Sequence, residues 1–163
     1  MKLKKQNNKV AIIMGSQSDY SVMRDCEKIL RILKIKYQAS IVSAHRTPKR
    51  MFEFAESASK NGFAVIIAGA GGSAHLPGMI ASLATVPVIG VPIESRKLKG
   101  LDSLLSIVQM PKGIPVGSVA IGEDGAMNAG LYAASIIALT NKDIKKNLKN
   151  YRSKQSKAVK QKP

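Results

Sequence analysis

The sequence predicts a single α/β domain in which a doubly wound parallel sheet forms the middle of three layers. Strand-like apolar runs alternate with amphipathic helical patterns five times along the chain, as repeated βα units do. The first of these runs, over 10–14, is continuously apolar, which is typical of a strand buried on both faces. The length of 163 residues suits one domain with a full hydrophobic core.

The first βα unit begins with a buried strand over 10–14 and a polar loop over 15–19. Apolar residues then recur at helical spacing as far as Leu33, with charged residues between them. Asp19 stands where the N-cap of this helix is expected. Cys26 falls on the apolar stripe of the helix, which favours a place in the core over a nucleophilic role.

The remaining units follow the same order. Strands are predicted over 36–42, 63–68, 86–91 and 116–121, and the helices that follow them over 48–60, 75–84, 101–109 and 124–139. Five such units on one chain indicate a flavodoxin-like sheet with helices on both faces. The last of these helices is apolar nearly all round, which predicts burial, in part between subunits.

Composition and charge exclude several classes of function. The net charge is +16, but residues 1–9 and 142–163 hold most of the excess. With 4% aromatic residues and none paired with basic ones, nothing predicts specific nucleic-acid binding. No apolar run free of charged and turn residues reaches the length of a membrane span, so no membrane partner is expected. A single cysteine cannot form an intrachain disulfide, which fits a cytoplasmic protein.

The stretch Ser43-Ala44-His45-Arg46-Thr47-Pro48 is the most informative in the chain. It lies between a strand and a helix, and Pro48 suits the first helical position. Serine, arginine and a helix N-terminus together can bind an anion, and His45 places a titratable imidazole beside them. The alternative interpretation is a capped turn that carries a surface histidine.

Polar loops follow the first three strands, at 15–19, 43–47 and 69–74. Because the carboxyl ends of parallel strands meet at one edge of a sheet, these loops are expected to form one pocket. The third loop leaves two interpretations open. Gly69, Gly71 and Ala74 match the spacing of a dinucleotide fingerprint, with Glu94 near the place of a ribose-binding acid. The other interpretation is a backbone nest that binds an anion such as a carboxylate.

Four motifs, taken together, resemble the PurE family. They are Gly15–Asp19, Ser43–Pro48, Gly69–Met79 and Ser106–Pro111. Their order and sequences resemble the class I members, which are N5-carboxyaminoimidazole ribonucleotide mutases. Class II relatives, which carboxylate aminoimidazole ribonucleotide directly with CO2, differ in the second and third motifs.

The resemblance implies an isomerase of de novo purine biosynthesis that converts N5-carboxyaminoimidazole ribonucleotide to 4-carboxy-5-aminoimidazole ribonucleotide. In the family's mechanism the substrate loses CO2, which is held in the pocket and is then attacked by the ring carbon. The resemblance implies that His45 is the general acid/base, and that no metal and no cofactor take part. An imidazole suits that role because its ordinary pKa lies near neutrality.

The resemblance also assigns binding roles. Ser16, Ser43 and Arg46 match positions that bind the phosphate, and Asp19 matches the position that binds the ribose. The residues that match the loop enclosing the base and the migrating carboxyl are Ala70, Gly71, His75 and Leu76. Ser18 and Ser73 are left out of the predicted binding set.

Three classes of function stay open from the residues alone. The first is the mutase, with a class II-type carboxylase as its nearest alternative. The second is a Rossmann-like dinucleotide-binding oxidoreductase, and the third is a non-enzymatic flavodoxin-like module such as a receiver. The resemblance implies a small-molecule ribonucleotide substrate, a homo-octamer, and functional coupling to the ATP-dependent carboxyaminoimidazole ribonucleotide synthase.

The motifs and the charge distribution divide the chain into three parts. We expect a basic N-terminal arm over 1–8, a catalytic α/β domain over 9–140 and a basic C-terminal helix or tail over 141–163. Ile144, Leu148 and Tyr151 recur at helical spacing in the tail and are expected to pack on a neighbouring subunit.

Overall fold

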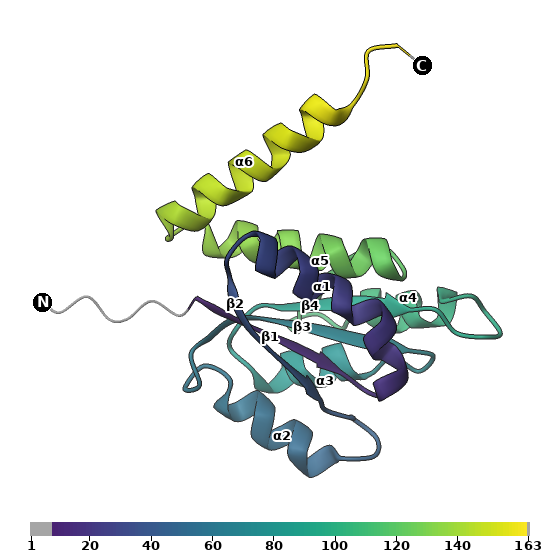
Figure 1. Cartoon of the computed structure of the whole chain (residues 1–163). Helices are drawn as coiled ribbons and strands as arrows, with labels where there is room; N and C mark the ends of the chain where they lie inside the picture. The colour runs from purple at the N-terminus through teal and green to yellow at the C-terminus, as the bar shows by residue number, and fades with distance from the viewer. Residues whose placement is uncertain (1–7, 163) are drawn as a thin grey trace, which may run out of the picture.

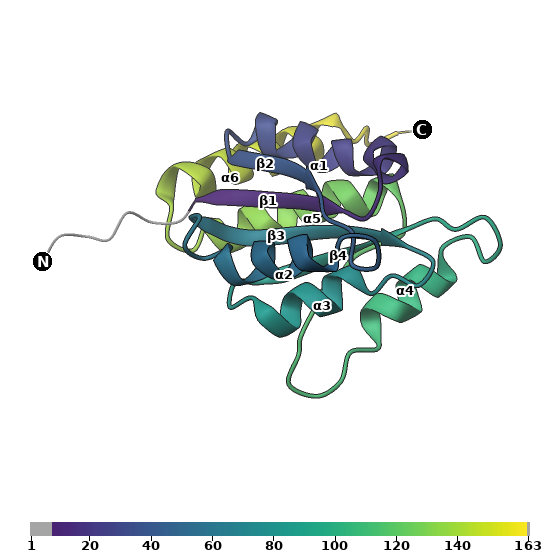
Figure 2. The ribbon, with the colours of Figure 1, turned by 90° about the horizontal axis from the view of Figure 1, so that it is seen from below.

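A parallel sheet of five strands forms the middle layer of the protein (Figures 1 and 2). The structure is a computed structural model that describes residues 8–162, so the predicted arm over 1–8 lies outside the described residues except for Asn8. The strands are β1 (Lys9–Met14), β2 (Lys36–Ile41), β3 (Phe63–Gly71), β4 (Val88–Ile93) and β5 (Gly117–Ser118). Their order, β2-β1-β3-β4-β5, is the flavodoxin-like one, and it confirms the predicted fold class.

Helices cover both faces of the sheet (Figure 1). One face is covered by α1 (Tyr20–Ile32) and α5 (Glu123–Ile137), with α6 (Lys142–Ala158) packed on α5. The other face carries α2 (Pro48–Ser57), α3 (Leu76–Leu83) and α4 (Leu101–Val108). Successive residues of β1 point to opposite faces, so Val10 and Ile12 join one core and Ala11 and Ile13 join the other. All four are buried, which explains why the strand reads as continuously apolar.

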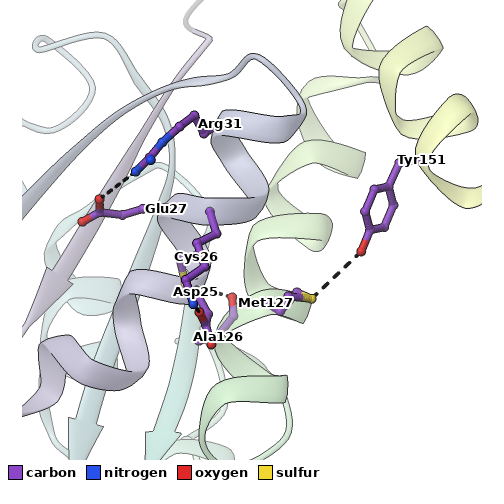
Figure 3. Close-up of polar contacts among 8 residues, drawn as sticks. Asp25, Cys26, Glu27, Arg31, Ala126, Met127 and Tyr151 are labelled. Atoms are coloured by element: carbon purple, nitrogen blue, oxygen red, sulfur yellow. Dashed lines mark hydrogen bonds and ion pairs between the residues drawn. The ribbon is translucent and has the colours of Figure 1, made fainter. Parts of the chain in front are cut away.

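Close packing joins α1 to α5. A side chain at Gly130 would collide with Ile29, so glycine lets the two helices approach. The Cys26 thiol donates a hydrogen bond to the carbonyl of Ala126 across this contact, over 2.9 Å (Figure 3). Cys26 is fully buried, and burial raises the pKa of its thiol. The prediction that Cys26 belongs to the core is confirmed.

The first half of α6 packs against the body of its own chain. Asn141 caps the helix by accepting hydrogen bonds from two backbone N–H groups of the first turn. Ile144 and Leu148 are buried in the core formed with α1 and α5, and the Tyr151 hydroxyl lies 4.0 Å from the Met127 sulfur (Figure 3). The expectation that Ile144 and Leu148 pack on a neighbouring subunit is therefore wrong, because this chain buries both of them. Tyr151 packs on the same core but is only partly buried.

Several boundaries differ from the predicted ones. The strand expected over 116–121 is reduced to the two residues of β5. Pro92 of β4 accepts a hydrogen bond from Gly122 but has no N–H to donate, so the ladder between β4 and β5 cannot continue. The strand expected over 86–91 begins after Pro87 for a related reason, and β3 continues to Gly71.

Asp19 also differs from its prediction. It occupies the N-cap position of α1, but its side chain makes no capping hydrogen bond. A short 3₁₀ turn, η1 (Gln17–Asp19), precedes the helix, and the Ser16 hydroxyl caps that turn by accepting from the Ser18 N–H. The Asp19 carboxylate is thus left for the space at the end of the strands.

Candidate active site

A cavity of about 490 Å³ lies at the carboxyl ends of β1 to β4, which is a size that suits a small-molecule ligand. The three polar loops meet there, as expected for a sheet of this topology. All nine residues predicted for the site line it: Ser16, Asp19, Ser43, His45, Arg46, Ala70, Gly71, His75 and Leu76. The structure thus brings them together, while the role of each stays a prediction.

Hydrogen bonds fix the loop after β2 against the loop after β1. The Arg46 guanidinium donates from Nη2 to the carbonyl of Gly15 over 2.6 Å. Its Nε and its backbone N–H both lie 3.3 Å from the Ser43 hydroxyl, which is buried. Thr47 closes the turn, because its hydroxyl exchanges 3.0 Å hydrogen bonds with the backbone N–H and carbonyl of Ser43. A hydroxyl and a cation are therefore held at the start of α2, where the helix dipole favours an anion.

The loop after β1 places a carboxylate on the same side of the cavity. Ser18 donates hydrogen bonds to the Ser16 hydroxyl over 3.0 Å and to the Asp19 carboxylate over 3.3 Å. Burial raises the pKa of the Asp19 carboxyl above its ordinary value, although these hydrogen bonds and the charge of Arg46 oppose the shift. A half-buried carboxylate of this kind can accept hydrogen bonds from the hydroxyl groups of a ligand.

Two imidazoles of the cavity lining touch each other. His45 Nε2 and His75 Nδ1 lie 2.9 Å apart, with the ring planes nearly perpendicular at 86°. One of these nitrogens must carry the proton that joins them, and the tautomer decides which. Both side chains are exposed to the cavity, so a proton can reach or leave the pair from a bound ligand.

The third loop combines apolar and backbone surfaces. Ala70 and Leu76 are buried and present apolar walls to the cavity. Between them the chain turns at Gly72, whose φ of 67° lies in the left-handed region that favours glycine. A dinucleotide fingerprint is not needed to explain Gly69, because a side chain there would collide with Met23 of α1.

The prediction missed some of the lining. Besides the backbone neighbours of the predicted residues, the cavity is lined by Ser73 and by Ile93, Glu94 and Ser95 at the end of β4. Ser73 had been left out of the binding set. The rule that ligands bind beyond the carboxyl ends of strands could have added the β4 loop, since β4 neighbours β3 in the sheet.

The cavity lining therefore combines two chemically different sets of groups. Hydroxyls, a guanidinium and a carboxylate together suit a phosphorylated sugar. A pair of imidazoles and the apolar walls of Ala70 and Leu76 suit proton transfer on a group shielded from water. In residues 8–162, no three side chains of His, Cys, Asp or Glu come together as metal ligands would, and no helix is long and apolar enough to cross a membrane.

Comparison with known proteins gives consistent results. The family described as AIR carboxylase matches residues 9–158. The N5-carboxyaminoimidazole ribonucleotide mutase of Escherichia coli strain K12 is 54% identical over 155 residues, which cover 95% of this chain and 92% of that protein. The mutase of Pyrococcus abyssi is 56% identical over 144 residues, which cover 88% and 82%. The crystal structure of Treponema denticola PurE superposes with a TM-score of 0.83 at 28% identity, over 91% of this chain and 92% of that one.

The raised pKa of Asp19 predicts that this side chain lowers stability at neutral pH. Because the folded-state pKa is higher than the unfolded one, the free energy of unfolding falls as pH rises from the ordinary value through the raised value. Asp19→Asn should therefore raise the midpoint of urea denaturation at pH 7. The gain should shrink near pH ~4, where the wild-type carboxyl is increasingly protonated.

The matched control for this prediction is Glu56→Gln, which removes an exposed carboxylate from α2. It should leave the midpoint nearly unchanged at both pH values. A lower midpoint for Asp19→Asn at pH 7 would show that the hydrogen bonds of the carboxylate outweigh its desolvation.

Proposed function

This chain belongs to the AIR carboxylase family and is an isomerase that converts N5-carboxyaminoimidazole ribonucleotide to 4-carboxy-5-aminoimidazole ribonucleotide in purine biosynthesis, and we propose that it does so by decarboxylation and recarboxylation with His45 as the general acid/base. The relatives from Escherichia coli and Pyrococcus abyssi, which are 54% and 56% identical, carry the mutase name, which favours this activity over a class II-type carboxylase and over an oxidoreductase. The observation that supports the mechanism best is the contact of His45 with His75 in the lining of the cavity.

The hydroxyl, guanidinium and carboxylate groups of the cavity fit the ribose phosphate. Ser16, Ser43 and Arg46 bind the phosphate, with Arg46 already oriented by its hydrogen bonds to Gly15 and Ser43. Asp19 accepts hydrogen bonds from the ribose hydroxyls. These contacts orient the aminoimidazole toward the two histidines, and they act equally on the ground state and the transition state.

The chemistry needs one proton to move from carbon to nitrogen. When the carbamate loses CO2, the electron pair of the broken N–C bond stays on the exocyclic nitrogen, which takes up a proton. The ring carbon then attacks CO2, forms the new C–C bond and releases its own proton. His45 supplies the first proton and accepts the second, and the His75 contact at 2.9 Å gives the proton a second nitrogen to occupy.

The bound CO2 must not escape between the two steps. Ala70, Gly71 and Leu76 enclose it, and the side chains of Ala70 and Leu76 are buried and apolar. His75 lies at the same wall. Excluding water there also keeps the intermediate from being hydrated.

The first prediction of this mechanism concerns His45. Asn keeps the approximate size and some hydrogen bonding but removes the titratable ring. His45→Asn should lower kcat by about two to four orders of magnitude, the usual contribution of a positioned general acid or base. KM should change far less, because the ribose phosphate contacts remain. The measurement is steady-state turnover of the carbamate substrate by the purified variant.

Arg46→Ala is the matched contrast for His45→Asn. It should mainly raise KM, since phosphate contacts stabilise the ground state and the transition state alike. A His45→Asn enzyme within a few fold of wild type would remove His45 from the mechanism and direct attention to His75.

We also propose that the chain assembles into a homo-octamer in the cytoplasm. Exposed apolar side chains support assembly: Leu101, Leu105 and Val108 form a stripe on α4, each about half exposed. Within α5, Tyr132 is likewise half exposed although the inner face of the helix is buried. Functional coupling to the ATP-dependent carboxyaminoimidazole ribonucleotide synthase is supported by the chemistry, because a carbamate that loses CO2 readily is best passed on quickly.

Light scattering tests the assembly. At micromolar concentration the mass should be close to that of eight chains. A Leu105→Glu variant should shift the distribution to smaller species, because a charge in a buried contact is costly. A stable wild-type monomer would contradict this proposal.

The basic tail is proposed to be dispensable for chemistry. Truncation after Ser153 keeps Ile144, Leu148 and Tyr151, which pack on the body, and removes only exposed residues of α6 and those beyond it. Turnover should stay nearly unchanged. A loss of more than about tenfold, or roughly 1.4 kcal/mol in the barrier, would contradict this view of the tail.

A further inference from the structure

A buried serine outside the cavity holds the loop that closes it. The helix α4 covers the same face of the sheet as α3 (Figure 2). Ser103 belongs to α4, and its side chain is fully buried. Its hydroxyl accepts a hydrogen bond from the backbone N–H of Gly72 over 2.8 Å. The same hydroxyl donates to the carbonyl of Ile93, the last residue of β4, over 2.6 Å. One oxygen thus joins α4, the end of β4 and the third cavity loop.

A second hydroxyl of the same helix reaches the same residue. Ser106 lies one turn after Ser103, and its hydroxyl is 3.4 Å from the carbonyl of Gly72. It lies closer to the Asp102 carbonyl, at 2.7 Å, so its contact with Gly72 is the weaker one. The Gly72 carbonyl also accepts a hydrogen bond from the Ala74 N–H within the loop, over 2.8 Å. Ser103 therefore makes the principal contact between Gly72 and α4.

Gly72 is the point where the loop needs such support. Its φ of 67° turns the chain sharply between Gly71 and Ser73, and both of these neighbours line the cavity. A Cβ added to Gly72 would meet no atom within 4 Å, so side-chain packing does not fix this turn. The position of the loop depends instead on its backbone hydrogen bonds.

We propose that Ser103 is a positioning residue that keeps the Gly71–Ser73 loop closed over CO2 between the two chemical steps. This inference rests on the proposed decarboxylation and recarboxylation. Ser103 touches neither substrate nor CO2, and it acts through Gly72. Loss of its hydroxyl lets the loop move away from the apolar wall, so that CO2 escapes before the ring carbon attacks it.

The test measures how consumed substrate is divided between two products. N5-carboxyaminoimidazole ribonucleotide with ¹³C in its carbamate carbon is converted in buffer that contains unlabelled bicarbonate. The aminoimidazole ribonucleotide released, corrected for loss without enzyme, counts the escapes, and labelled 4-carboxy product counts the completed turnovers. Both products are formed by folded, active enzyme. Their ratio therefore stays the same when a substitution only lowers the fraction of the variant that is folded.

For Ser103→Ala we expect the ratio of escapes to completed turnovers to rise about tenfold, in line with the loss of one well-formed hydrogen bond. KM should stay within about twofold, since the ribose phosphate contacts are unchanged. Ser103→Thr keeps the hydroxyl and should keep the wild-type ratio, even where its extra methyl lowers the unfolding temperature. Ser106→Ala should raise the ratio less than Ser103→Ala does.

Ser135→Ala is the matched control. Within residues 8–162, its hydroxyl bonds only to the Leu131 carbonyl of α5, at 3.0 Å, away from the cavity. It should leave the ratio unchanged. An unchanged ratio in Ser103→Ala, with only a slower rate or lower stability, would overturn the inference.

The proposed mechanism fails by a different result. In that case the new carboxyl group of the 4-carboxy product made by the wild-type enzyme would carry unlabelled carbon from the bicarbonate in solution. Such a result would mean that the enzyme retains no CO2 between the two steps. The wild-type label content therefore tests the mechanism, and the variant ratios test the role of Ser103.

Discussion

The parallel pairing of β1 with both of its neighbours is the constraint on which the site depends. Met14, the last residue of β1, pairs with Ile41 at the end of β2 and with Gly69 near the end of β3. The loops that follow these strands therefore start side by side. A slip of one residue would move a strand by about 3.3 Å and turn its side chains to the opposite face. The 2.9 Å contact between His45 and His75 would not survive such a slip.

The groups that form the site lower the local stability of the fold. It holds a desolvated carboxylate, a glycine in the left-handed region and two histidines exposed to a cavity. The surrounding structure compensates with buried apolar strands and with hydrogen bonds that reach into the loops, such as those of Arg46 and Ser103. Such a division between a rigid scaffold and a costly site is common in enzymes, because the groups that bind and react with a ligand lack partners without it.

Much of the fold and of the site could be predicted from the sequence, because both follow from patterns along the chain. Apolar runs indicate the strands, and the loops at their carboxyl ends contain the candidate residues. The remainder depends on contacts between distant residues. The meeting of His45 with His75 depends on strand register, and the shortness of β5 depends on Pro92 in the neighbouring strand. Ser103 reads as an ordinary polar residue of an amphipathic helix, and only the packing of α4 shows that its hydroxyl is buried.

The buried thiol of Cys26 has a practical consequence. A thiol reacts with alkylating agents and oxidants as the thiolate, and burial together with the hydrogen bond to Ala126 opposes both ionisation and access. The chain has no other cysteine. The thiol of the native protein should therefore not react with thiol-specific reagents. One cysteine introduced at the surface would be the single point of attachment for a dye or spin label.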